Sequence, residues 1–132
     1  MNHAFGNGEW LNESFQPTQT VWRTYDKSST IIVPGKTFVF LDEHPDGIND
    51  AAFASACTGN RANDSPSSSR IIDFPANYHG GSCGFSFCDG HAELHKWRGS
   101  AIQTQPAMQR PAVTAGDLLD WTWLAQHASA HN

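Results

Sequence analysis

The chain has 132 residues, with 13 acidic and 8 basic side chains and a formal net charge of -5. This length fits one globular domain over residues 1–132, and 39% hydrophobic with 16% charged residues is typical of a chain that folds around a core. No apolar run reaches the roughly 20 residues that span a bilayer. No basic stripe is present that could neutralise phosphates. We therefore expect no membrane segment and no nucleic-acid partner.

Three segments have the pattern of β-strands. Residues Thr20–Tyr25 and Lys36–Asp42 are rich in β-branched and aromatic side chains and are bounded by Pro, Gly or Ser. Arg70–Asp73 is a shorter candidate that ends before Pro75, because proline cannot donate to a sheet ladder. The polar stretch Thr58–Ser69 between them predicts an exposed loop.

A β-hairpin is predicted around Asp89-Gly90, where apolar and polar residues alternate on both sides of the pair. A two-residue loop at Asp89-Gly90 would place Phe87 opposite Ala92. The predicted core face then carries Phe85, Phe87, Ala92 and Leu94. The predicted polar face carries Ser86, Cys88, His91, Glu93 and His95.

A helix is predicted over Asp117–His127. Thr114 and Asp117 have the spacing of a capping box, with Asp in place of the more usual Glu or Gln. The apolar residues of this segment are too many for one narrow stripe, so we expect packing on more than one side. A strand over Trp121–Leu124 is the alternative.

The three cysteines leave at least one thiol unpaired. On one extended strand Cys83 and Cys88 would lie about 16 Å apart, beyond disulfide reach. Any disulfide would therefore involve Cys57, and three cysteines cannot form a four-cysteine zinc site.

An acidic cluster follows the second predicted strand and is the candidate metal site. Its carboxylates are Asp42, Glu43, Asp46 and Asp50. A bound cation would relieve their mutual repulsion, and oxygen ligands suit calcium better than zinc. The spacing is not that of an EF-hand. The alternative is a solvated acidic loop that caps a short helix over Asp50–Ala56.

The candidate catalytic residues are His79, Asp89 and His91. The hairpin is expected to bring them toward one end of the sheet, with His79 or His91 as a general base and Asp89 orienting it or a metal. His91 and Glu93, two positions apart on a strand, could share one metal ion. The alternative is the ordinary wetted face of an antiparallel sheet.

The nucleophile of such a site is expected to be a water activated by a metal or by histidine. Ser82 and Ser86 are conceivable nucleophiles, but neither stands in a Gly-x-Ser-x-Gly elbow. Gly80 and Gly81 could present N–H groups to an oxyanion, or they could simply form a turn.

His79, nine residues, and then Asp89-Gly90 form an H-x9-DG pattern. With this pattern the chain resembles the prepilin-type processing-associated H-x9-DG family, which is related to type II secretion pseudopilins. The segments Phe38–Asp50, Asp73–Trp97 and Asp117–Gln126 also look like parts of that family.

The resemblance implies a pilin-like α+β domain, in which an antiparallel sheet packs on a long N-terminal helix, and an extracytoplasmic location. It also implies other pilin-like subunits as partners and, by analogy with major pseudopilins, calcium in loops beside the sheet. The apolar N-terminal helix is missing from this sequence. We therefore expect either a truncated fragment or a free-standing pilin-like domain with another use.

Two functions remain open. One is a calcium-binding, pseudopilin-like domain of the type II secretion or type IV pilus kind. The other is a small calcium-dependent hydrolase of esters or lactones, suggested by the histidines and carboxylates gathered in one small domain.

Overall fold

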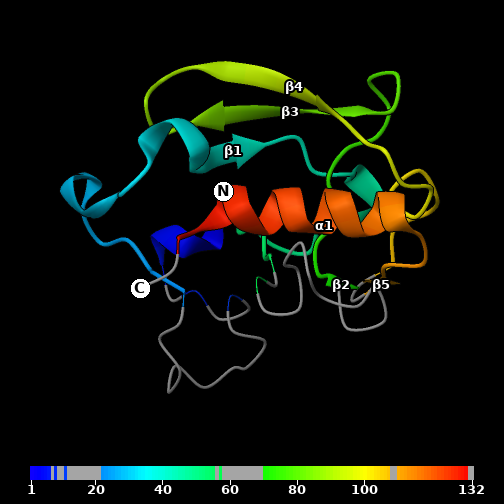
Figure 1. Ribbon diagram of the computed structural model, residues 1–132, viewed down its shortest axis with the longest axis horizontal. Helices are drawn as coiled ribbons and strands as arrows, with labels where there is room; N and C mark the ends of the chain where they lie inside the picture. Colours follow the sequence, from blue (N-terminus) through cyan, green and yellow to red (C-terminus); the bar gives the residue numbers. More distant parts are fainter. Residues whose placement is uncertain are drawn as a thin grey trace.

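A three-stranded antiparallel sheet and one helix form the frame of the protein. The computed structural model describes residues 1–6, 8, 11, 22–55, 57, 70–107 and 110–130. The sheet has the order β1-β3-β4, with β1 at Phe38–Leu41, β3 at Ser82–Phe87 and β4 at Ala92–Lys96. Helix α1, Ala115–Ala128, lies along one side of this sheet (Figure 1). Strand β3 is central, and β1 and β4 are the two edge strands. This arrangement confirms the α+β class.

Shorter elements surround this frame. Strands β2 (Arg70–Ile71) and β5 (Arg110–Pro111) pair antiparallel as a separate two-stranded ribbon. Four single 3-10 turns are η1 (His3–Phe5), η2 (Ser28–Thr30), η3 (Pro34–Lys36) and η4 (Pro45–Gly47). Within the described ranges, no helix is both long and apolar enough to cross a membrane.

The predicted hairpin is present, but its register differs by one residue. Phe85 pairs with Glu93 and Ser86 pairs with Ala92, so the loop has three residues rather than two. Because side chains alternate along a strand, a slip of one residue moves every side chain of β4 to the opposite face. The prediction that Ala92 and Leu94 share the core face with the phenylalanines is therefore wrong.

The three-residue loop explains this shift. The Gly90 N–H donates to the Phe87 carbonyl at 3.0 Å, and the Phe87 N–H donates to the His91 carbonyl at 2.9 Å. Gly90 has φ of 95°, in the left-handed region that favours glycine. These bonds and the positive φ of Gly90 have the pattern of a tight turn followed by a glycine bulge, which the sequence pair Asp-Gly allows as readily as the two-residue turn.

Helix α1 begins at the predicted capping box. The Thr114 hydroxyl accepts from the Asp117 N–H at 3.1 Å, and the Asp117 carboxylate accepts from the Thr114 N–H at 2.8 Å. The helix ends at Ala128, one residue beyond the prediction, and the alternative strand over Trp121–Leu124 is wrong. The Trp121 side chain of this helix is fully buried.

The core lies between α1 and the sheet and continues under the loops. Its largest buried side chains include Phe38, Phe53, Phe74, Phe85, Phe87, Trp97, Ile102, Trp121 and Leu124. Phe85 contacts both Phe38 and Trp123 edge to face, at ring-centroid distances of 5.4 and 4.9 Å. The sheet is thus joined to the helix through one central aromatic residue.

The other strand predictions have mixed outcomes. Lys36–Asp42 contains β1, and Arg70–Asp73 contains β2, which is shorter than expected. The part of Thr20–Tyr25 that is described, residues 22–25, forms no continuous strand, and no helix covers the described part of Asp50–Ala56. The predicted loop Thr58–Ser69 lies outside the described residues. All three cysteines are free.

Candidate functional site

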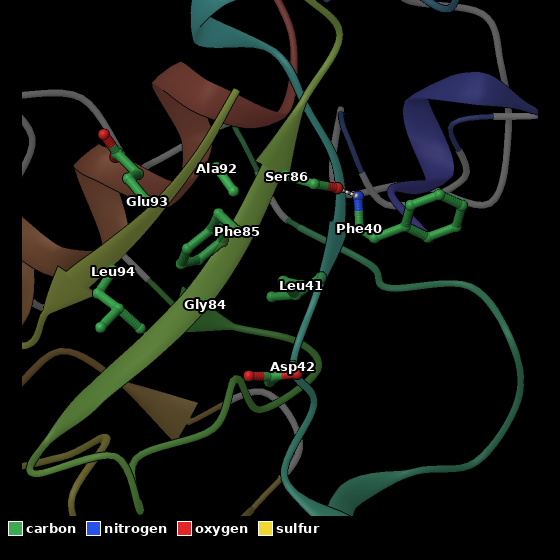
Figure 2. Close-up of a pocket in the computed structure, with 9 residues that line it drawn as sticks. All are labelled: Phe40, Leu41, Asp42, Gly84, Phe85, Ser86, Ala92, Glu93 and Leu94. Atoms are coloured by element: carbon green, nitrogen blue, oxygen red, sulfur yellow. Dashed lines mark hydrogen bonds between the residues drawn. The ribbon is translucent and has the colours of Figure 1, made fainter. Parts of the chain in front are cut away.

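A shallow groove of about 500 Å³ crosses the sheet face that points away from α1. It is lined by Phe40, Leu41, Asp42, Gly84, Phe85, Ser86, Ala92, Glu93 and Leu94 (Figure 2). Phe40 and Leu94 are 58% and 71% exposed, and together they give this face an exposed apolar surface. The register of β4 creates this apolar surface, because it turns Ala92 and Leu94 outward.

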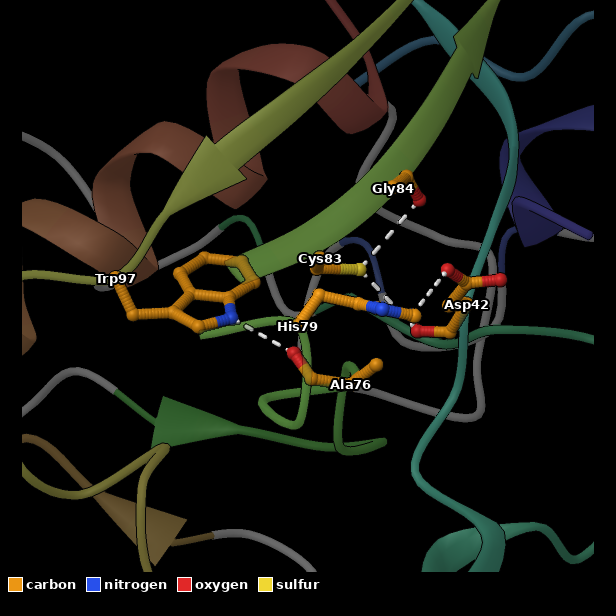
Figure 3. Close-up of polar contacts among 6 residues, drawn as sticks. All are labelled: Asp42, Ala76, His79, Cys83, Gly84 and Trp97. Atoms are coloured by element: carbon orange, nitrogen blue, oxygen red, sulfur yellow. Dashed lines mark hydrogen bonds and ion pairs between the residues drawn. The ribbon is translucent and has the colours of Figure 1, made fainter. Parts of the chain in front are cut away.

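An imidazole–carboxylate pair stands at one end of the groove. His79 Nε2 lies 3.2 Å from Asp42 Oδ2, and both side chains are about half exposed. Figure 3 shows the His79 ring reaching toward Asp42, next to Cys83. The Tyr78 ring packs beside the imidazole at a centroid distance of 4.7 Å. This pair comes from two elements, the end of β1 and the turn before β3.

The backbone around Asp42 is held firmly. Its N–H donates to the Gly84 carbonyl at 3.1 Å, and its carbonyl accepts from the Ala76 N–H at 2.8 Å. The Ala76 carbonyl in turn accepts from the Trp97 indole at 2.8 Å (Figure 3). Gly84 permits this arrangement, because a Cβ there would lie 3.0 Å from Asp42 Oδ2.

Asp89 and His91 form a second pair in the hairpin turn. Asp89 Oδ1 lies 2.6 Å from His91 Nδ1 and accepts from the His91 N–H at 3.1 Å. These hydrogen bonds from His91 hold the pKa of Asp89 below its ordinary value. The His91 ring stacks on Phe87 at 4.3 Å. The pair therefore serves the turn and the sheet packing.

The three candidate catalytic residues do not converge. His79 precedes β3 and Asp89 follows it, and the six residues of β3 span about 20 Å. The structure brings Asp89 and His91 together and pairs His79 with Asp42 instead. The expectation that all three meet at one end of the sheet is wrong, because His79 and Asp89 lie at opposite ends of β3.

The proposed nucleophile and oxyanion groups are used by the fold. The Ser86 hydroxyl accepts from the Phe40 N–H at 3.3 Å. Gly80 and Gly81 have φ of 64° and 77°, and the Gly81 N–H donates to the Asn77 carbonyl. These glycines form a turn, as the alternative interpretation predicted. Ser82 begins β3.

A row of stacked rings lies between β4 and α1 and was not predicted from the sequence. The Trp123 ring stacks on His95 at 3.7 Å and on His127 at 4.0 Å. Burial lowers the pKa of His95 to about 4, and burial also lowers the pKa of His127. The predicted register placed His95 on the solvent side, so this contact could not be foreseen.

The predicted calcium ligands are engaged separately. Asp42 pairs with His79, and the Asp50 carboxylate accepts from the Ala52 N–H at 2.7 Å. Asp46 is exposed, beside His44. In the parts of the chain that the structure describes, no group of three or more His, Cys, Asp or Glu side chains is arranged to hold a metal ion.

Glu43 is the most perturbed of these carboxylates. Burial, followed by the nearby charge of Asp73, raises its pKa to about 7. Its Oε1 atom is buried and has no hydrogen-bond partner. Asp73 is itself buried and accepts from the Ala54 N–H at 2.6 Å. The charge of Asp73 therefore disfavours the charged form of Glu43.

Calcium binding by these carboxylates stays a prediction, and thermal unfolding tests it. If Asp42, Glu43, Asp46 and Asp50 hold calcium, the metal stabilises the native state by about 2.7 kcal/mol at a 100-fold excess over its Kd. Chelator should then lower the Tm, as measured by calorimetry. An identical Tm with calcium and with chelator would discard the site.

Comparisons with protein-family models, curated proteins and solved structures found no match for this chain. Chemically, the His79–Asp42 pair could orient a base beside an apolar groove, whereas the Asp89–His91 pair is committed to the turn.

Proposed function

We propose that this chain is a pseudopilin-like domain of the type II secretion or type IV pilus kind, that it works outside the cytoplasm, and that it acts by binding pilin-like subunits. Two features of the fold support the proposal. A helix packs on one face of a short antiparallel sheet, and the opposite face carries an open groove with exposed apolar side chains.

The observation that carries the proposal is the use of the H-x9-DG residues by the fold. His79 joins the turn before β3 to the end of β1 through Asp42. Asp89 and Gly90 form the turn that joins β3 to β4. The two ends of the pattern thus organise both ends of the central strand, which is what a fold-determining pattern requires. A catalytic pattern would bring its residues together.

The alternative function is an ester or lactone hydrolase. The His79–Asp42 pair beside the groove favours it, because an imidazole held by a carboxylate is a suitable general base. Removal of a required general base typically lowers the rate about 10²–10⁴-fold. The two functions therefore differ sharply in what replacement of His79 should do.

We expect His79→Ala to change stability only slightly, and we expect neither this variant nor the native chain to hydrolyse esters or lactones. An exposed ion pair of this kind contributes about 0–1 kcal/mol, so the Tm should fall by a few degrees at most. Hydrolysis of a panel of esters and lactones, with calcium and with chelator, should stay at the uncatalysed rate for the native chain. Turnover that is lost in His79→Ala and kept in His91→Ala would favour the hydrolase.

Binding is tested separately, by interferometry with the purified globular domain of a major pseudopilin. Saturable binding by the native chain, weakened by Phe40→Lys in the groove, is the expected result. Leu119→Lys is the matched control, because Leu119 is also about half exposed but lies on α1. The absence of binding would contradict the proposed function.

A further inference from the structure

The outer edge of β4 presents unpaired backbone groups. The Phe87 N–H donates to the His91 carbonyl, and the Trp97 N–H donates to the Gly81 carbonyl, both at 2.9 Å. Because hydrogen-bonded pairs alternate along an antiparallel ladder, the odd-numbered residues of this strand bond to β3. The N–H and C=O groups of Ala92, Leu94 and Lys96 point away from the sheet. No described segment pairs with this edge.

This edge is also open to solvent. Every residue of β4 except His95 is exposed, and Leu94, at the centre of the strand, is 71% exposed. Figure 1 shows β4 as the outermost strand, with nothing described beyond it. Proteins usually protect edge strands with proline, a bulge or a covering element. In β4 the protection consists of Glu93 and Lys96 alone.

We propose that β4 pairs antiparallel with β4 of a second copy of this chain, around a two-fold axis at Leu94. The two three-stranded sheets then form one continuous six-stranded sheet, and the Leu94 side chains of the two copies lie opposite each other. This inference goes beyond the proposed function, since it depends only on the edge of β4.

Charge and overlap select this register. With the axis at Leu94, all five residues of each strand pair, Ala92 lies opposite Lys96 of the second copy, and Glu93 lies opposite His95 of the second copy, so that no like charges face each other. An axis at Glu93 would place the two glutamates directly opposite each other, where like charges destabilise. An axis at His95 would pair only residues 94–96. The axis at Leu94 is therefore the register that pairs the whole strand without placing like charges opposite each other.

The two-fold symmetry makes the dimer closed. An antiparallel pair of identical strands uses the same surface on both copies, so each edge satisfies the other and no further copy can add there. The outward N–H and C=O groups of both strands become hydrogen-bonded. The product is a defined dimer, in contrast to the open-ended association that an exposed edge otherwise permits.

Cysteine cross-linking tests the register directly, in a Cys88→Ser background that removes the one partly exposed native thiol. Leu94→Cys should form a disulfide-linked dimer, because directly opposite hydrogen-bonded residues have Cα atoms about 5.5 Å apart. Ala92→Cys alone and Lys96→Cys alone should not, because each is about 14 Å from its counterpart. A mixture of those two variants should cross-link.

Sedimentation of the native chain measures the association without cross-linking. We expect a species of twice 14.5 kDa. Leu94→Lys should weaken association by at least 10-fold, because two lysines would then face each other, while the exposed position leaves the fold of the monomer intact. Leu119→Lys, at the exposed leucine of α1, should associate as the native chain does.

The proposal is overturned by three results. The first is a native chain that stays monomeric at about 1 mM, the weak end of specific association. In that case the outer edge of β4 either pairs with a strand of another protein or has no partner. The second is equal association of Leu94→Lys and Leu119→Lys. The third is cross-linking of Ala92→Cys or Lys96→Cys alone as readily as Leu94→Cys. Failure of the pseudopilin binding test would leave these outcomes unaffected.

Discussion

Replacement of Gly99 by alanine is expected to lower the free energy of unfolding by about 3 kcal/mol and the Tm by about 10 °C. A Cβ at position 99 would lie 2.6 Å from both the backbone nitrogen and the Cα of Asp117. These atoms belong to the first turn of α1, which cannot move without breaking its capping box. Chemical denaturation followed by circular dichroism measures the loss.

The matched control is Gly47→Ala. A Cβ at position 47 would meet its nearest atoms at 3.5 Å or more, which is ordinary contact. Its effect should stay within about 1 kcal/mol. Equal stabilities of the two variants would show that the loop at Gly99 and the start of α1 are not as closely packed as the structure describes.

Buried carboxylates explain why Gly99 lies so close to the helix. Asp120 accepts from the N–H groups of Arg98 and Gly99, at 2.7–3.0 Å. Asp117 accepts from the Ala101 N–H at 2.9 Å. Two acids on successive turns of one helix thus satisfy the backbone of a distant loop. Sequence reasoning found the capping role of Asp117 because that role is local, and it missed these longer contacts because nothing local encodes them.

The hairpin shows a second limit of sequence reasoning. Alternation predicted both strands and the turn position, and these are confirmed. It could not choose between a two-residue and a three-residue loop, because Asp89-Gly90 suits both. That single choice decides whether Leu94 or His95 faces the helix. One residue of register therefore turned Glu93 and His95 toward the helix side and turned Ala92 and Leu94 outward, where they line the apolar groove.

The predicted site residues had a similar outcome. The pair of Asp89 and His91 is close in sequence and forms as local spacing suggests. The partner of His79 is Asp42, which is 37 positions away and was predicted as a calcium ligand. Such a long-range pair depends on how β1 lies beside β3, and spacing along the chain contains no information about it.

Acid is expected to unfold the protein partly through its buried histidines. Burial lowers the pKa of His95 to about 4, and burial lowers the pKa of His3 to about 4, from an ordinary value of 6.5. Below pH 6.5 the unfolded chain binds protons at these rings, whereas the folded chain resists them down to about pH 4. Their contribution to stability is complete above pH 6.5 and is lost as the pH falls toward 4.

Glu43 acts in the opposite direction over part of this range. Its pKa is raised from 4.5 to about 7, so the folded state binds its proton more tightly than the unfolded state does. The stability it contributes is complete below pH 4.5 and is lost as the pH rises to 7. The Tm of the native chain between pH 4.5 and 6.5 therefore combines two opposing trends, and a single variant is needed to separate them.

His95→Phe isolates the histidine effect. Phenylalanine can keep the stack on Trp123 and removes both the titrating ring and its buried Nε2, which has no hydrogen-bond partner. Relative to the native chain, the variant should gain stability as the pH falls from 6.5 to 4, by about 2 kcal/mol once solvent contact of the half-buried ring is allowed for. The Tm difference measured by calorimetry across this range reports the gain.

His91→Phe is the matched control for this experiment. His91 is exposed and stacks on Phe87, so its replacement keeps an aromatic ring on the same strand pair. It is expected to follow the native chain much more closely than His95→Phe between pH 6.5 and 4. If His95→Phe shows the same pH dependence of Tm as the native chain, then His95 is protonated in the folded state. In that case the row of rings between β4 and α1 would have to be more accessible to water than the burial of His95 indicates.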